Sequence, residues 1–365
     1  MRQELIEYPL VDDSGGLNDI LEHIEDARLL ALDTEFLRER TYYPELCVLQ
    51  IATDKIIVAI DCLAPVDLDP LFKSLLAPEK IWLLHSARQD LEVLFYRADA
   101  LPEQLIDTQI AAALIGLPMQ IGLQGLLEET LQVSIGKQHT RSDWSHRPLP
   151  EALQRYALDD VRYLHPACRQ LKEQLESLGR ATWFDEECAR QLGIPVEPEV
   201  QTIFERTRGT GSLKGQHRAA ALALVAWREE KARARNRPRR WILADDKLSR
   251  IAAALPQSLA DLSRVPDLPA RFVARSGDSL LDAIDNAEPV DDIPEPAPPD
   301  RAVVKLLQSE IRSLAETIGI QPELLATRRD IATVAAGRLP ETLSSGWRGL
   351  ILGEILEKVS SGRAF

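Results

Sequence analysis

The stretch LLALDTEFL, residues 29–37, constrains the fold of this chain more than any other. Its apolar residues predict a buried β-strand, and residues two apart in a strand point to the same face. Asp33 and Glu35 therefore place two carboxylates on one face of an otherwise apolar element. Burying two like charges is costly, so the fold must bring positive charge or a metal ion to this strand.

Two more short apolar runs follow closely, at residues 46–52 and 55–61. The connections between these three runs are too short for a crossover helix, so we expect hairpins and an antiparallel arrangement. A fourth strand is predicted at 81–86, where the sequence reads IWLLHS.

From Arg88 onward the apolar residues recur with a helical period. Residues 132–149 have no clear period and are interpreted as a loop. The run 150–179 then predicts one long helix, with Pro150 suitably placed in its first turn. Strands followed by helices make the first part of the chain an α/β protein.

Composition adds limits on class and location. A chain of 365 residues, 45% of them hydrophobic, is globular and long enough for two or three domains. The N-terminus lacks the features of a signal peptide, and no apolar run approaches the roughly 20 residues of a membrane span. Scattered cysteines favour reduced thiols, so we expect a cytoplasmic protein without membrane association. They are Cys47, Cys62, Cys168 and Cys188.

Charge is distributed unevenly along the chain. The net charge is −14, yet residues 201–250 hold 13 basic and five acidic residues. This window carries +8 and the remainder −22, so local binding of a polyanion is compatible with an acidic protein. The densest basic run, RARNRPRR, is the candidate binding segment. Its arginines are Arg233, Arg235, Arg237, Arg239 and Arg240.

The second half of the chain is helical and contains a stiff linker. Residues 287–300 are rich in proline and acidic residues, which predicts an extended segment. The helical blocks on either side show weak similarity, between residues 241–256 and 323–340, which suggests a duplicated module. We therefore predict four parts, with boundaries at 1–200, 201–286, 287–300 and 301–365.

Three further residues complete an acidic constellation. Asp90 lies in the first turn of the helix after the fourth strand, and Asp160 follows Tyr156 by four residues, on the same helical face. Four carboxylates without histidine are the ligands that Mg²⁺ or Mn²⁺ prefers. Two such ions about 4 Å apart stabilise the attacking and the leaving oxygen of a phosphoryl displacement. The pattern thus indicates a nuclease-type metal site.

The segments LDTEF, HSARQD and YALDD resemble the three motifs of the DEDD superfamily of 3′–5′ exonucleases, in the variant with tyrosine in the third motif. Their surroundings, including TYYPELCVLQIA and SDWSHRPLPEALQRYALDDVRYL, resemble the ribonuclease D family. The block with NRPRRWILADDKL is similar to the helicase-and-ribonuclease-D C-terminal (HRDC) domain. The resemblance implies a ribonuclease H-like mixed-sheet exonuclease domain, followed by two all-α HRDC-type domains, the second divergent.

The same resemblance implies a role for each site residue. Asp33 would bridge two metal ions, Glu35 and Asp160 would complete one ion site, and Asp90 would help to hold the other. Tyr156 would orient the attacking water. A competing pair, His139 and Asp143, has the spacing of the histidine version of the third motif, but it lies in a loop and is disfavoured.

The implied activity is a metal-dependent hydrolase, a 3′–5′ exoribonuclease that releases 5′-mononucleotides. The expected substrates are tRNA precursors with 3′ extensions and other structured RNAs, with no obligate protein partner. The four acids do not distinguish RNA from DNA, so a DNA exonuclease is the alternative. A catalytically inactive RNA-binding scaffold is a distant third, because the complete acid set argues against it.

Candidate RNA contacts lie near the predicted site as well as in the basic run. Lys137, Arg141 and Arg147 could bind phosphates from the irregular loop. Trp144 either stacks on a base or packs beneath that loop. Phe36, directly after the acidic pair, could wedge against the terminal base.

Overall fold

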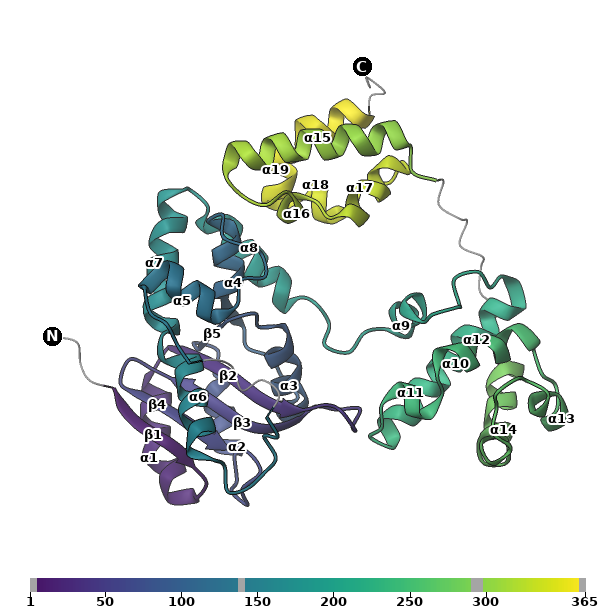
Figure 1. The fold of residues 1–365 in the computed structure, drawn as a ribbon, viewed down its shortest axis with the longest axis horizontal. Helices are drawn as coiled ribbons and strands as arrows, with labels where there is room; N and C mark the ends of the chain where they lie inside the picture. Colours follow the sequence, from purple (N-terminus) through teal and green to yellow (C-terminus); the bar gives the residue numbers. More distant parts are fainter. Residues whose placement is uncertain (1–4, 137–141, 290–297, 361–365) are drawn as a thin grey trace. The chain divides into compact units, whose positions relative to one another are not determined.

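The computed structural model describes residues 5–136, 142–289 and 298–360 (Figure 1). The chain forms two compact units. The first, here called the sheet unit, comprises residues 1–36, 46–194 and 296–365, and the second, the helical unit, comprises 37–45 and 195–295. None of the described helices is both long and apolar enough to cross a membrane. The four domain boundaries drawn from the sequence stay a prediction.

The sheet unit contains a six-stranded mixed sheet in the order β1-β4-β3-β2-β5-β6. β3 and β4 pair antiparallel, whereas β1 with β4, β2 with β5 and β5 with β6 pair parallel. The predicted mixed-sheet class is therefore confirmed. The strands are β1 Ile6–Val11, β2 Leu29–Leu37, β3 Glu45–Ala52, β4 Ile56–Asp61, β5 Ile81–Leu84 and β6 Gln104–Asp107.

The two edge strands, β1 and β6, were not predicted. β1 is mostly exposed and contains a proline, and β6 is only four residues long. Edge strands of this kind lack the continuous apolar run that marks a central strand. The strong signals came from β2, β3 and β4, which are largely buried.

Alternation along β2 assigns its side chains to two layers. Leu30 and Leu32 belong to a core with apolar residues of the helices on one face of the sheet. Those helices are α1 Ser14–Asp26, α2 Asp69–Leu75 and α3 Arg88–Ala98. Asp33 and Glu35 consequently point to the other face, toward α6, Glu151–Arg162. Figure 1 shows α6 crossing the sheet on this side.

The long helix predicted at 150–179 is broken into two. α6 ends at Arg162, and α7 runs from Leu164 to Ser177, with Tyr163 between them in a non-helical conformation. Pro166 lies in the first turn of α7. Because proline lacks a backbone N–H and its ring collides with the carbonyl four residues earlier, it tolerates a helix start but not a helix interior.

Helices complete the sheet unit, including those of the C-terminal segment. Trp347 stacks on Trp183 with ring centroids 4.6 Å apart, and its indole N–H donates to Glu187 over 2.9 Å. These contacts join the last helix to α8. The helices are α4 Thr108–Leu114, α5 Leu123–Leu131, α8 Ala181–Leu192, α15 Arg301–Ile318, α16 Pro322–Leu325, α17 Arg328–Ala335, α18 Glu341–Ser344 and α19 Gly346–Ser360.

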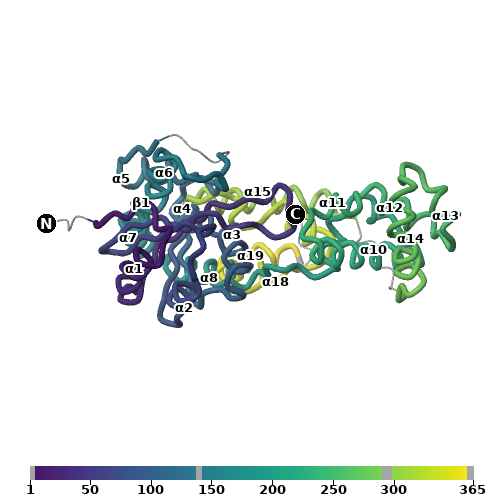
Figure 2. Tube along the Cα trace, turned by 90° about the horizontal axis from the view of Figure 1, so that it is seen from below, coloured from purple at the N-terminus to yellow at the C-terminus, as the bar shows by residue number. Residues whose placement is uncertain are grey.

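The helical unit is built around its longest helix, α10, on which α12 and α14 pack (Figure 2). Its core includes Leu224, Leu248 and Leu280, all without solvent exposure. The helices are α9 Val200–Arg206, α10 Gly215–Ala234, α11 Arg239–Ile242, α12 Asp245–Ala254, α13 Leu259–Ser263 and α14 Ala270–Asp285.

The weak sequence similarity between the two helical blocks has a structural counterpart. α11 and α12 are separated by two residues, and so are α16 and α17. In each pair a four-residue helix ends in extended backbone, at Leu243 and Ala326 respectively, and a longer helix follows. This likeness supports the predicted duplication.

The segment 37–45 continues β2 and belongs to the helical unit. Tyr42 is 8% exposed and lies in the core of that unit. Its hydroxyl donates to Glu229, and the backbone N–H groups of Tyr42 and Tyr43 donate to Asn236 Oδ1 over 2.9 and 3.1 Å. Arg239 completes this Glu229 cluster with two hydrogen bonds to the carboxylate, of 2.5 and 2.6 Å.

Candidate active site

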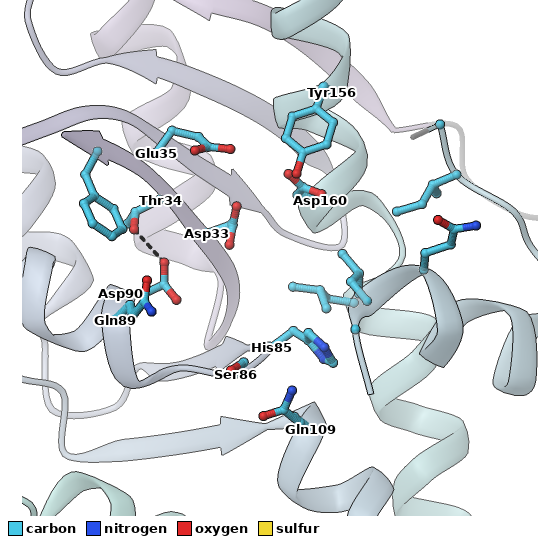
Figure 3. A pocket seen from close by; sticks show the side chains of 17 residues that line it. Asp33, Thr34, Glu35, His85, Ser86, Gln89, Asp90, Gln109, Tyr156 and Asp160 are labelled. Carbon is cyan, nitrogen blue, oxygen red and sulfur yellow. Dashed lines mark hydrogen bonds between the residues drawn. The ribbon is translucent and has the colours of Figure 1, made fainter. Parts of the chain in front are cut away.

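One cavity of about 540 Å³ in the sheet unit collects all five residues predicted to be catalytic. Strand β2 contributes Asp33 and Glu35, α3 contributes Asp90, and α6 contributes Tyr156 and Asp160 (Figure 3). Asp33 and Asp160 are 127 residues apart in the sequence, yet both side chains line this one cavity.

Three of the carboxylates form a compact group. Oxygen atoms of Asp33, Glu35 and Asp160 all lie within 4.8 Å of one another. Asp160 is 9% exposed, and the other two are half-buried. A group of this size could hold one divalent cation.

Asp90 reaches the cavity from the opposite layer. It lies in the first turn of α3 and is 7% exposed. The hydroxyl of Thr34 donates to Asp90 Oδ1 over 2.5 Å, and Thr34 lies on the other face of β2 from Asp33. This bond orients one carboxylate oxygen of Asp90 at the point where the two layers meet.

The turn between β5 and α3 is held by a residue that the sequence did not single out, Asp107. Its carboxylate accepts the N–H groups of Ser86 and Ala87 over 3.0 and 2.8 Å, and that of Gln109 over 2.8 Å. Asp107 thereby fixes the start of the helix that carries Asp90. Its position at the N-cap of α4 was the only sequence signal.

The electrostatics of the cavity are those of four uncompensated acids. Burial first, and the neighbouring carboxylates second, raise the pKa of Asp33 well above its ordinary value. Burial likewise raises the pKa of Glu35 to about 8, and those of Asp90 and Asp160 to about 7. Among the described residues that line the cavity, none is lysine or arginine. A divalent cation would supply the missing positive charge, and the four carboxylates are suitable ligands for it.

Tyr156 points into the same cavity and donates a hydrogen bond to Asp160. Burial and the surrounding carboxylates raise the pKa of its hydroxyl, so it stays protonated at neutral pH. It is therefore available as a donor and not as a base.

A second residue that the sequence analysis overlooked is His85, which lines the cavity beside Ser86. His85 Nε2 lies 3.0 Å from the Ile121 carbonyl, and Nδ1 lies 2.9 Å from the Thr108 hydroxyl. Gln109 donates to the same carbonyl over 2.9 Å. Burial lowers the pKa of His85, so the ring is neutral and ties the end of β5 to the chain before α5.

The predicted RNA contacts near the cavity divide into two groups. Phe36 lines the cavity and also packs against the core of the sheet unit, and its contact with a terminal base stays a prediction. Trp144 is only 1% exposed, and its ring centroid lies 6.0 Å from that of Tyr156. Its indole therefore packs beneath the loop, the second of the two alternatives. Lys137, Arg141 and His139 lie outside the described residues.

Arg147 has a structural role in place of the predicted phosphate contact. Its guanidinium donates to both oxygens of Asp61, over 2.5 and 2.6 Å, and to the carbonyls of Cys47, Trp144 and His146. These bonds engage its donors with protein acceptors and leave little for a phosphate.

The basic run of the helical unit is also divided. Arg239 is bound by Glu229, and Arg233 contacts Tyr42 and pairs with Glu197 at 3.2 Å. Arg235, Arg237 and Arg240 are exposed. Within this run, these three have no acidic partner among the described residues, although Arg237 donates to the Arg40 carbonyl over 3.4 Å.

Comparison with known proteins supports the geometry. The chain matches the family model of 3′–5′ exonucleases over residues 8–176 and that of HRDC domains over residues 217–284. It is 35% identical over 367 residues to ribonuclease D of Gluconacetobacter diazotrophicus, covering 97% of this chain and 93% of that protein. It is 34% identical to ribonuclease D of Pseudomonas paraeruginosa, covering 90% of each.

The chain belongs to the ribonuclease D family. The crystal structure of Escherichia coli ribonuclease D, described as an exoribonuclease involved in structured RNA processing, superposes with a TM-score of 0.84 at 31% identity and covers 99% of both chains. The protein is accordingly a 3′–5′ exoribonuclease, and the DNA alternative is not favoured. An exonuclease domain of this type uses divalent metal ions, which agrees with the donor set of the cavity.

Proposed function

We propose that this ribonuclease D acts through two divalent ions, Mg²⁺ or Mn²⁺, and shortens RNA from the 3′ end with release of 5′-mononucleotides. Asp33, Glu35 and Asp160 would hold one ion, and Asp33 with Asp90 the other. The observation that carries the proposal is the convergence of four carboxylates with raised pKa values, two of them buried and two half-buried, on one cavity. When bound, the ions stabilise the charge that develops on the attacking and leaving oxygens.

The protein's own groups position the reactants. The Tyr156 hydroxyl donates, so it orients the attacking water and keeps the Asp160 carboxylate in place. The Thr34 hydroxyl donates to Asp90 and keeps that carboxylate in place. Phe36 lines the cavity next to Glu35, where its ring would contact the terminal base.

The preferred substrates, in this proposal, are tRNA precursors with 3′ extensions. An RNA end threaded into the cavity would leave the body of the RNA outside. Arg235, Arg237 and Arg240 in the helical unit are exposed and are the proposed contacts to its phosphates. We further propose a cytoplasmic location, a reducing compartment that suits the scattered cysteines of this sequence.

A matched digestion tests the proposal. A 5′-labelled tRNA precursor with a 3′ extension is incubated beside a DNA strand of the same sequence, with Mg²⁺, with Mn²⁺ and with EDTA. We expect stepwise shortening of the RNA, release of 5′-mononucleotides and complete inhibition by EDTA. Equal turnover of the DNA strand would support the DNA alternative, and turnover in excess EDTA would contradict the two-ion mechanism.

The arginine contacts have their own test. Replacing Arg235 and Arg240 by alanine should weaken RNA binding and reduce the slope of log K against log salt by roughly two, because about one counterion is released per phosphate contact. Arg264→Ala, which removes an exposed arginine elsewhere in the helical unit, is the matched control. An unchanged salt slope in the double variant would exclude these residues as contacts.

A further inference from the structure

The cavity has two chemically different walls. Asp33, Glu35, Asp160 and Tyr156 lie on one side, Asp90 lies beside Gln89 at the edge between the two, and His85, Ser86 and Gln109 supply only neutral polar groups on the other side (Figure 3). The scissile phosphate belongs with the acids and their ions. An uncharged part of the terminal nucleotide must therefore face the neutral wall.

Ser86 is the residue of that wall whose backbone stands out. Its φ is +62°, in the left-handed region that residues with a Cβ rarely adopt. Asp99, Gln132 and Leu255 share this conformation, but each of them ends a helix, where it is common. Ser86 instead precedes α3 and lines the cavity.

Glycine would adopt the Ser86 conformation with less strain. The chain instead keeps a serine there and holds its backbone with the Asp107 carboxylate, which accepts the N–H groups of Ser86 and Ala87. Strained backbone that the surroundings hold in place is a recurrent feature of functional sites. The hydroxyl, which glycine lacks, is the group that distinguishes the two residues.

The Ser86 hydroxyl is available to a ligand. Ser86 is exposed, and within the described residues its hydroxyl has no hydrogen-bond partner. Gln89 lies three residues further on, in the first turn of α3, and is likewise exposed in the cavity without a partner among the described side chains. A hydroxyl and an amide that line the same cavity can each donate and accept hydrogen bonds.

The terminal ribonucleotide carries a matching group. Its ribose 2′-OH both donates and accepts hydrogen bonds, is uncharged and is the feature that separates RNA from DNA. We propose that Ser86, supported by Gln89 in the first turn of α3, hydrogen-bonds to the 2′-OH of the 3′-terminal nucleotide and so gives the cavity a preference for RNA ends. This inference rests on the proposed function, because it assumes that the phosphate lies at the acidic wall.

A single-atom change in the substrate tests the contact. Two RNA oligonucleotides are compared that differ only in the last sugar, ribose in one and 2′-deoxyribose in the other, and kcat/KM is measured for removal of that nucleotide. We expect the wild-type enzyme to prefer the ribose end by about tenfold, the scale of one or two hydrogen bonds. In Ser86→Ala and in Ser86→Gly the preference should fall to within about twofold.

Two variants separate the hydroxyl from the backbone strain. Ser86→Gly relieves the strain and should raise Tm, whereas Ser86→Ala keeps the strain and should not. Asp99→Gly is the matched control, since it relieves the same conformation at the exposed end of α3. It should preserve the preference for the ribose end.

The outcomes are distinct. Full discrimination in Ser86→Ala, or no discrimination in the wild-type enzyme, would overturn the proposed contact while leaving the exonuclease mechanism intact. Failure of the wild-type enzyme to degrade either oligonucleotide with Mg²⁺ or Mn²⁺ would overturn the proposed function, and the inference about Ser86 with it.

Discussion

Two buried acidic sites in this chain respond to burial in opposite ways. In the cavity, burial and mutual repulsion raise the pKa values of Asp33 and Glu35. In the Glu229 cluster, burial alone would raise the pKa of Glu229, but hydrogen bonds from Arg239 and Tyr42 lower it below its ordinary value. A carboxylate is thus costly in the half-buried cavity and favourable at the buried Glu229.

The difference lies in the partners, because Glu229 is the less exposed acid and yet the one whose pKa is lowered. Arg239 binds Glu229 through two hydrogen bonds and Arg233 lies 3.7 Å away, whereas no arginine or lysine of the described chain lines the cavity. A paired acid stabilises a fold, and an unpaired cluster keeps its charge available for a ligand. One stretch of sequence contributes to both sites, because β2 carries Asp33 and continues into the segment that carries Tyr42.

The largest effect is expected when Asp33 is replaced in the acidic group of the cavity. Asp33→Asn should lower turnover by at least about 10³-fold, because the ligand proposed to be shared by both ions is removed. The metal-free protein should become more stable, since one of the repelling charges is gone. Single-turnover assays and calorimetry in EDTA measure the two effects, with exposed Asp99→Asn as control. Retained turnover would contradict the assignment of Asp33.

Replacing Glu229, the paired acid, should change stability in the opposite direction. Glu229→Gln should destabilise the helical unit by about 2 kcal/mol, because the hydrogen bonds from Arg239 and Tyr42 lose their charged acceptor. Hydrogen exchange of the α10 peptides in the full chain reports this change. Glu230→Gln, at the exposed neighbouring position, is the control and should have little effect. Unaltered protection of α10 would mean that the cluster is not stabilising.

Tyr156→Phe tests whether the hydroxyl orients the attacking water, without changing the charge of the cavity. The four acids remain, so Mg²⁺ affinity measured by titration calorimetry should change little. The value of kcat should fall by about 10², the scale for a misplaced reacting group. A variant with the turnover of the wild-type enzyme would show that the hydroxyl does not orient the water.

The smallest effect concerns pH. The folded-state pKa values of Glu35, Asp90 and Asp160 lie at about 7 to 8, above those of an unfolded chain, so the folded protein binds more protons. Their contribution to stability is therefore fully present at acidic pH and is lost as pH rises through 7 to 8. In EDTA, Tm should fall by a few degrees between pH 6 and pH 8.5.

Metal should reverse this trend. Mg²⁺ binds the deprotonated acids, so it should raise Tm more at pH 8.5 than at pH 6. Glu229 has a lowered pKa, so its contribution is instead lost on acidification. A Tm in EDTA that rises between pH 6 and pH 8.5 would contradict the raised pKa values in the cavity.

Much of the site could be predicted because local periodicity decides it. The two-residue repeat of a strand places Asp33 and Glu35 on one face, and the four-residue spacing of a helix places Tyr156 beside Asp160. Trp144 and Arg147 could not be assigned in this way. A buried indole and a guanidinium bound to Asp61, 86 residues away in the sequence, depend on which segments meet in space.

By itself, the sequence determined the strand with its two acids, the helices that carry their three companions and the membership of the ribonuclease D family. Tertiary structure alone decided the partners of each charge. Among the described residues, no arginine or lysine lines the cavity, whereas two arginines and Tyr42 surround Glu229. The physical reason is that periodicity acts over one or two turns, whereas desolvation and pairing depend on neighbours that can lie far away in the sequence, 187 residues for Tyr42 and Glu229. The left-handed backbone conformation of Ser86 also depends on tertiary structure, because the Asp107 carboxylate accepts the Ser86 N–H group.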